Sequence, residues 1–211
     1  MPQSAERRHI LNGRLVPESR LVVSPRDLGL LRGYGVFDFL ISYQAGQPFH
    51  LTDHVERLFR SAALLELDVP WSKAQIIVWT WDALRANVSI GGEHQIRIVL
   101  SGGLGDDSMT PSRERATLVI FIDPHVSYPA AHYADGVGVV TRHHCRHLPA
   151  AKSINYIEGV RGVAQARRQG GVEVVYHDDR TDSFRLNSGG IPDFRGVFYH
   201  LPVTAASGPK T

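Results

Sequence analysis

Along the first 122 residues, segments with the hydrophobic pattern of β-strands alternate with segments that have the pattern of α-helices. Short apolar runs flank the dipeptide Asn12-Gly13, and aromatic and β-branched residues fill positions 36–43. Asn-Gly tolerates the positive φ angles of a type I′ turn, so the first runs predict a β-hairpin, and the second run is typical of a strand. Two more runs of this kind, at 94–101 and 116–122, predict further strands. This part of the chain therefore predicts an α+β unit with an antiparallel sheet.

The segments between these strands carry the helical period instead. After Asp53, which we expect to cap a helix with Glu56 three residues later, apolar side chains recur at helical spacing at Val55, Leu58, Phe59, Ala62 and Leu65. A second helix is predicted from Pro70 to about residue 87, because Ser72 and Gln75 stand in capping-box positions.

A break in the pattern divides the chain. Residues 123–133 contain two prolines and predict an interdomain linker. Beyond it, strands are predicted at 136–142 and 172–178, with a helix from 154 to about 168 that Gly170-Gly171 should end. Regularity fades from about residue 180. We therefore predict an α/β chain with a small α+β domain (1–122), a linker (123–133) and an incomplete large domain (134–211).

Composition narrows the function classes. The chain has 211 residues, 43% of them hydrophobic, a net charge of +2 and no block of like charges, which argues against nucleic-acid or membrane binding. Its single cysteine, Cys145, excludes an internal disulfide and fits a reducing compartment. The N-terminus has no apolar leader, and no segment reaches the length of a membrane span. We expect a cytoplasmic protein.

Lysine is rare in this chain. Among 23 cationic side chains only Lys73, Lys152 and Lys210 are lysines. Lys152 stands in "LPAAKSINYIEG", where Pro149 and two alanines precede a predicted helix. A lysine at such a junction can be partly desolvated, which lowers its pKa and frees the amine to attack a carbonyl, whereas arginine stays protonated. The alternative is an exposed lysine at a strand end.

Three ordered blocks carry a resemblance to a known family. "RDLGLLRGYGVFDFL", "HLTDHVERLFRSAALLEL" and "RHLPAAKSINYIEGV" closely resemble the blocks of class IV (fold type IV) aminotransferases, which depend on pyridoxal 5′-phosphate. The family includes branched-chain and D-amino-acid aminotransferases and aminodeoxychorismate lyase. The resemblance implies that Lys152 holds the cofactor covalently and moves a proton during catalysis.

The same resemblance implies roles for other residues. Arg57 matches the arginine that binds the cofactor phosphate, although a solvated helix face is the alternative. Tyr156 matches the residue that hydrogen-bonds the phenolic oxygen of the cofactor; a tyrosine packed in the core is the alternative. Phe37 matches a residue lining the substrate pocket, or it is plain core. Arg97 resembles an arginine near the substrate side, or it serves a domain or dimer interface.

A histidine- and cysteine-rich stretch, "RHHCRHLP" at 142–149, raises the question of a metal. Successive strand residues point to opposite faces, so at most two of its side chains could share a site. The sequence has no second cluster to complete a zinc site. We expect no metal.

The resemblance weakens after the last predicted strand. There the family has a motif like "V-T-E-G-S-x-S-N-x-F", whose glutamate pairs with the pyridinium nitrogen, while this chain has "RTDSFRLN" with Asp182 in that place. Beyond Asn187 the match ends, which predicts a truncated chain with a divergent tail. The resemblance implies a homodimer that transfers an amino group between an amino acid and a 2-oxo acid, branched-chain-like or D-amino-acid-like. A lyase and an inactive truncated relative are the alternatives.

Overall fold

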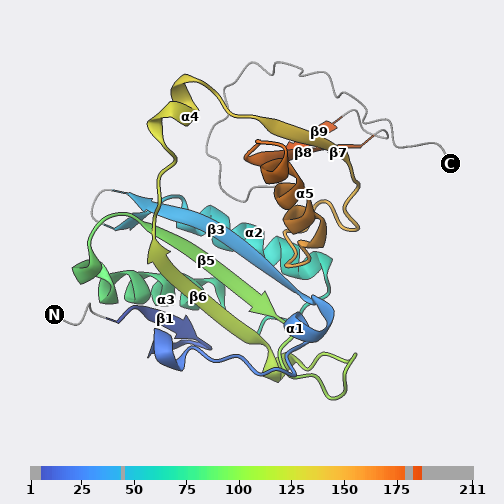
Figure 1. The fold of residues 1–211 in the computed structure, drawn as a ribbon. Helices are drawn as coiled ribbons and strands as arrows, with labels where there is room; N and C mark the ends of the chain where they lie inside the picture. The colour runs from blue at the N-terminus through green and yellow to red at the C-terminus, as the bar shows by residue number, and fades with distance from the viewer. Residues whose placement is uncertain (1–5, 44–45, 179–182, 187–211) are drawn as a thin grey trace.

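The computed structural model describes residues 6–43, 46–178 and 183–186. Figure 1 shows a large sheet with two helices packed behind it, and a smaller unit above it that holds the last strands. The large sheet has six strands in the order β2-β1-β6-β5-β3-β4. These strands are β1 (Arg8–Leu11), β2 (Arg14–Pro17), β3 (Gly35–Tyr43), β4 (Gln47–Pro48), β5 (His94–Ser101) and β6 (Thr117–Pro124).

Every pairing in this sheet is antiparallel, as predicted. The β1–β2 hairpin turns at Asn12 and Gly13, whose φ angles of 49° and 79° suit a type I′ turn. The predicted hairpin is therefore confirmed, and the predicted strands coincide with β3, β5 and β6 to within one or two residues.

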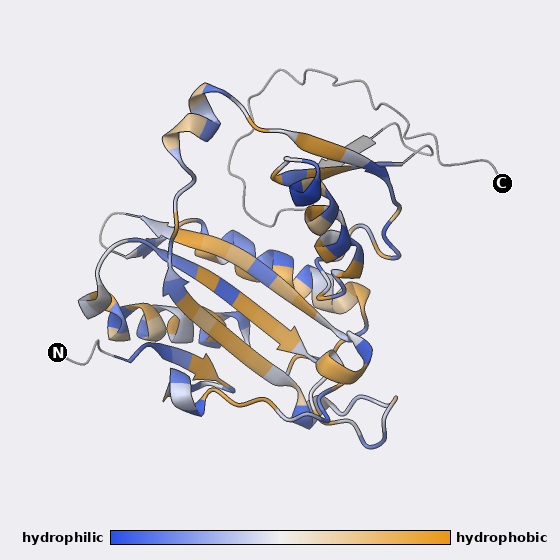
Figure 2. Ribbon diagram, viewed as in Figure 1, coloured by the Kyte–Doolittle hydropathy of each residue, from blue (hydrophilic) through white to orange (hydrophobic). Residues whose placement is uncertain are grey.

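Two long helices, α2 (Leu51–Leu64) and α3 (Lys73–Ala86), cover one face of the sheet. The apolar colouring of the central strands in Figure 2 marks the core between them. Fully buried residues include Val55, Leu58, Ile76, Ile96, Ile98 and Ile120. The Ser72–Gln75 capping box of α3 is confirmed. The predicted Asp53 cap of α2 is wrong, because the helix begins earlier: His50 precedes it, and Asp53 instead accepts a hydrogen bond of 2.8 Å from the His50 ring.

A short helix, α1 (Leu28–Arg32), leads into β3, and three single turns of 3-10 helix lie at Glu18–Arg20, Val88–Ile90 and Arg113–Arg115. After β6 the chain passes through α4 (Ala130–Ala134) into the smaller unit. The domain limits predicted at residues 122 and 133 remain a prediction. In the structure β6 continues to Pro124, and α4 spans the second limit.

The smaller unit is a β-α-β arrangement with one added strand. β7 (Val139–His143) pairs in parallel with β8 (Glu173–Asp178), and α5 (Ile157–Arg168) crosses between them, as a parallel pair requires. β9 (Ser183–Leu186) pairs antiparallel with β8, so the expectation of no regular structure after about residue 180 is wrong at these four residues. The mixed α/β fold predicted from the sequence is confirmed.

The helix predicted from residue 154 begins three residues later, at Ile157. Residues 153 and 154 are held against β3, where Ser153 bridges to Val36 and the N–H of Ile154 donates to the carbonyl oxygen of Gly35 at 3.0 Å. This contact joins the smaller unit to the large sheet immediately beside Lys152. In the described part of the chain, no helix has the length and apolar character that crossing a membrane requires.

Candidate active site

The backbone of Lys152 is fixed on two sides. Its carbonyl oxygen accepts a hydrogen bond of 2.9 Å from the N–H of Phe37 on β3. Its own N–H donates to the hydroxyl oxygen of Ser61, a buried residue of α2, at 3.1 Å. Lys152 therefore lies where the loop before α5 meets both the sheet and the helix layer.

The amine of Lys152 is half-buried, with Nζ 5.1 Å from the centre of the Phe37 ring. Burial lowers its pKa, the charge of Asp38 opposes this change, and the charges of Arg57 and Arg146 reinforce it. An amine with a lowered pKa is neutral, and hence nucleophilic, for a larger share of the time at neutral pH. This is the chemical property that the sequence predicted for Lys152.

Arg57 is tied to a buried carboxylate. From α2 it donates through Nε to Oδ2 of Asp38 at 2.8 Å and through Nη2 to Oδ1 at 2.7 Å. Burial alone would raise the pKa of Asp38, but the hydrogen bonds from Arg57 and His54 outweigh it and hold the pKa at about 2. Asp38 is therefore ionised at any physiological pH, and Arg57 is more than part of a solvated helix face.

His54 completes this group one turn before Arg57 on α2. Its Nδ1 lies 2.8 Å from Oδ1 of Asp38 and 3.1 Å from Nη2 of Arg57. A carboxylate only accepts and a guanidinium only donates, so we assign the Nδ1 proton to the bond with Asp38. Asp38 thus receives three hydrogen bonds from α2.

Tyr156 stands at the start of α5 and packs against the same aromatic ring as Lys152. Its ring contacts Phe37 edge-on, with 5.2 Å between the ring centres. The guanidinium of Arg146 lies 5.1 Å from the centre of the Tyr156 ring. Phe37 therefore contacts both the reactive amine and the tyrosine.

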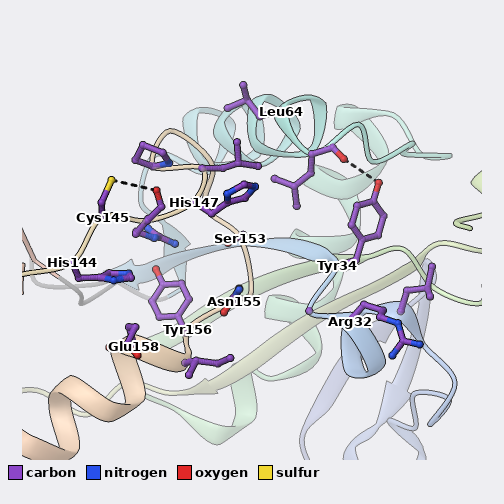
Figure 3. Close-up of a pocket in the computed structure, with 18 of the residues that line it drawn as sticks. Arg32, Tyr34, Leu64, His144, Cys145, His147, Ser153, Asn155, Tyr156 and Glu158 are labelled. Carbon is purple, nitrogen blue, oxygen red and sulfur yellow. Dashed lines mark hydrogen bonds between the residues drawn. The ribbon is translucent and has the colours of Figure 1, made fainter. Parts of the chain in front are cut away.

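A cavity of about 1520 Å³ opens beside this group, between the large sheet and the smaller unit. Figure 3 shows Tyr156, His144 and His147 on one side of it and Arg32 and Tyr34 on the other. Of the predicted site residues that the structure describes, Tyr156 is the one that lines this cavity. The cavity therefore adjoins the lysine site with Tyr156 at the boundary.

Four predicted residues meet in the structure: Phe37, Arg57, Lys152 and Tyr156. Arg97 is exposed on β5, with its guanidinium 5.9 Å from the Phe39 ring centre. Because Arg97 pairs with Phe39 across the sheet, it shares the face of Phe37 but lies one row further along. Asp182 lies outside the described residues, so its predicted pairing with a pyridinium nitrogen stays a prediction.

The sequence reasoning missed three supporting residues, Asp38, His54 and Ser61. A signal for Asp38 was present, since a carboxylate inside the apolar run "VFDFLI" needs a buried partner. The helical spacing of His54 and Arg57 places both on one face of α2, which could have supplied that partner. Nothing in the sequence pointed to Ser61.

The described residues contain no group of three or more His, Cys, Asp or Glu side chains arranged to hold a metal ion. From the stretch "RHHCRHLP", His144, Cys145 and His147 line the cavity, and the Cys145 thiol is exposed and unpaired with another cysteine.

The chain as a whole is similar to proteins of one known family. The family model described as "Amino-transferase class IV" matches residues 35–182, and the chain belongs to this family. It is 34% identical over 176 residues to a putative branched-chain-amino-acid aminotransferase of Methanocaldococcus jannaschii, covering 81% of this chain and 59% of that protein. It is 28% identical to a D-alanine aminotransferase of Staphylococcus aureus, covering 92% of this chain and 68% of that protein.

A solved structure agrees with this assignment. The branched-chain aminotransferase of Thermoproteus uzoniensis, determined with norvaline, superposes with a TM-score of 0.68 at 26% identity, covering 83% of this chain and 61% of that one. The chain therefore spans about three fifths of the length of the branched-chain relatives that it matches.

Proposed function

We propose that this chain binds pyridoxal 5′-phosphate, with Lys152 as the covalent attachment and Arg57 as the phosphate ligand. The observation that carries the proposal is the meeting of a lysine of lowered pKa with an arginine that has a donor to spare. Nε and Nη2 of Arg57 are committed to Asp38, but Nη1 has no hydrogen-bond partner among the described residues, and 44% of the side chain is exposed. A forked cation of this kind suits a phosphate dianion.

The activity we propose is the transfer of an amino group between an amino acid and a 2-oxo acid. Pyridoxal phosphate, when bound, supplies an electron sink for the carbanion formed at Cα. Lys152 carries a proton to and from the substrate, for which its lowered pKa is suited. Phe37 lies against the amine and Tyr156 packs on Phe37, so the two rings limit the access of water to the amine.

The substrate class follows from the relatives and stays part of the proposal. One relative is named for branched-chain amino acids and the other for D-alanine, so an aliphatic amino acid of either hand is the class to test. We assign Arg97 and Phe37 to the substrate side and Asp182 to the ring nitrogen on the strength of the family resemblance. A homodimer and a cytoplasmic location complete the proposal, and the exposed single thiol of Cys145 is consistent with a reducing compartment.

Borohydride reduction in the presence of pyridoxal phosphate, followed by peptide mapping, tests the cofactor assignment. We expect the label on Lys152, no label on Lys73 or Lys210, and none at all in Lys152→Arg. A label elsewhere would contradict the proposal. Turnover of branched-chain and D-amino acids with 2-oxoglutarate then tests the activity, and release of pyruvate from aminodeoxychorismate without an amino acceptor would point to lyase chemistry instead. Light scattering at micromolar concentrations tests the dimer.

A further inference from the structure

Asp38 is an unusual residue for its position in the sheet. It points toward the helix layer from β3, its side chain is 0% exposed, and the residues on the same face of the strand, Val36 and Leu40, belong to the apolar core. An ionised carboxylate in such a place is tolerated only when hydrogen bonds and opposite charges compensate for its lost hydration. Because burying this carboxylate is energetically unfavourable, Asp38 is a candidate for a functional role.

Apart from the backbone N–H of Phe39, which donates to Oδ1 of Asp38 at 2.7 Å, the compensating groups belong to the proposed cofactor site. Arg57 and His54 reach Asp38 from α2. Lys152, in the loop before α5, is held beside Asp38 by the bond of 2.9 Å from the N–H of Phe37 to its carbonyl oxygen, and its amine lies within electrostatic range of the carboxylate. The positive charge of Arg146, which follows β7, also acts on Lys152 and lowers the pKa of its amine. Within the described residues, Asp38 is thus the carboxylate whose negative charge raises the pKa of Lys152.

We propose that Asp38 is a positioning residue of this site: it locks the guanidinium of Arg57 so that Nη1 remains for a phosphate dianion, and it provides the fixed counter-charge of Lys152. The inference rests on the proposed function and goes beyond it, because Asp38 itself touches neither cofactor nor substrate.

The first role follows from the shape of the guanidinium. Its five donors are coplanar, so fixing Nε and Nη2 on one carboxylate also fixes the direction of Nη1. An arginine already held in place loses less conformational freedom when the phosphate binds. Asn in place of Asp38 would turn an amide NH₂ group or a single oxygen toward the fork, and one of the two bonds would be lost.

The second role follows from charge. Asp38 stabilises the protonated form of Lys152, while burial and the two arginines destabilise it. Removing the negative charge leaves the destabilising influences unopposed, so the amine should titrate at lower pH in Asp38→Asn than in the wild type.

The first experiment compares the affinities of pyridoxal phosphate and pyridoxal for the full chain. The ratio of the two isolates the contribution of the phosphate, since both compounds present the same aldehyde to Lys152. We expect the ratio to fall about tenfold in Asp38→Asn, as the loss of one charge-assisted bond implies. Asp53→Asn is the matched control, because it also removes a carboxylate paired with a histidine, here His50, but an exposed one.

The second experiment needs no cofactor. Reductive methylation with ¹³C-formaldehyde labels the three lysines and the N-terminus, and Lys152→Arg identifies the Lys152 signal in the NMR spectrum. We expect this signal to titrate at lower pH in Asp38→Asn and to be unchanged in Asp53→Asn. A purely structural role for Asp38 would not displace it.

His54→Ala keeps the proposal testable if Asp38→Asn does not fold. It removes one of the three bonds that α2 makes to Asp38 but not the charge, so we expect a smaller fall in the affinity ratio, about two- to threefold, and an unchanged Lys152 titration. An unchanged ratio in His54→Ala and Asp38→Asn, or an equal fall in Asp53→Asn, would overturn the inference. If wild-type protein forms no adduct at Lys152, the proposed function fails, while the titration still decides whether Asp38 is the counter-charge.

Discussion

The hydroxyl of Ser61 holds the backbone of Lys152 in place, by accepting a hydrogen bond of 3.1 Å from its N–H. Ser61 is buried in α2, so no water replaces the hydroxyl when it is removed. The orientation of the reactive lysine therefore depends on a side chain from the layer of helices behind the sheet.

Ser61→Ala should destabilise the fold by about 1–2 kcal/mol, because it leaves a buried N–H without a partner. It should also slow the borohydride-trapped labelling of Lys152, since the loop is then held from the β3 side alone. Chemical denaturation and timed peptide mapping measure the two effects. Ser108→Ala, an exposed loop position, is the control and should change neither. Wild-type stability and labelling in Ser61→Ala would contradict the role assigned to this bond.

Gly35→Ala should displace the Lys152 loop from the sheet. A Cβ atom at this position would lie 2.7 Å from the carbonyl oxygen of Leu100 and 2.9 Å from Cδ1 of Ile154. The first neighbour is backbone and cannot move cheaply, so we expect a loss of about 1–3 kcal/mol and weaker cofactor binding. At Gly138 the nearest atom would be 3.4 Å away, which makes Gly138→Ala the matched control. Equal unfolding midpoints for the two variants would refute the prediction.

The depressed pKa of Asp38 predicts an acid-sensitive fold. The carboxyl titrates at about 2 when folded, against an ordinary value of 3.8, so the folded state binds this proton less readily than the unfolded state. Stability from this group is fully present above pH 3.8 and is lost as the pH falls toward 2, with a total of about 2.5 kcal/mol. Urea unfolding at stepped pH should show a flatter profile between pH 4 and 2 in Asp38→Asn than in the wild type. Parallel profiles would contradict this origin.

Much of this architecture could be predicted because it is local. The hairpin at Asn12-Gly13 and the capping box of α3 depend on neighbouring residues, and both were predicted correctly. The start of α5 was misplaced because residues 153 and 154 pair with β3, far away in the sequence, and this pairing overrides their helical period. Similarly, β9 exists because it pairs with β8, a partner that no local pattern in "SFRL" reveals.

The candidate site likewise contains residues that the sequence could reveal and residues that it could not. Lys152 was found by its rarity and by a family motif, and Arg57, Phe37 and Tyr156 by the motif alone. Asp38 and Ser61 were not predicted, because their roles depend on the residues around them in the folded protein. The carboxylate and the hydroxyl reach their hydrogen-bond partners only once α2 has packed on β3. The role of Arg97 stays a prediction: the family match suggested a substrate contact, and the structure places it on the face of Phe37, one row further along the sheet.

The bond between Ser61 and Lys152 joins positions 91 residues apart along the chain. For this bond to form, the intervening polypeptide must close a long loop. The chain loses conformational entropy on closure before the contact contributes any stability. The hairpin of β1 and β2 and the helices α2 and α3 have no such delay, since their partners are near in sequence. The nucleophile should consequently reach its final environment late in folding, after the β1–β2 hairpin and the two helices have formed. An intermediate that has only these local elements would hold Lys152 in water, with an ordinary amine pKa.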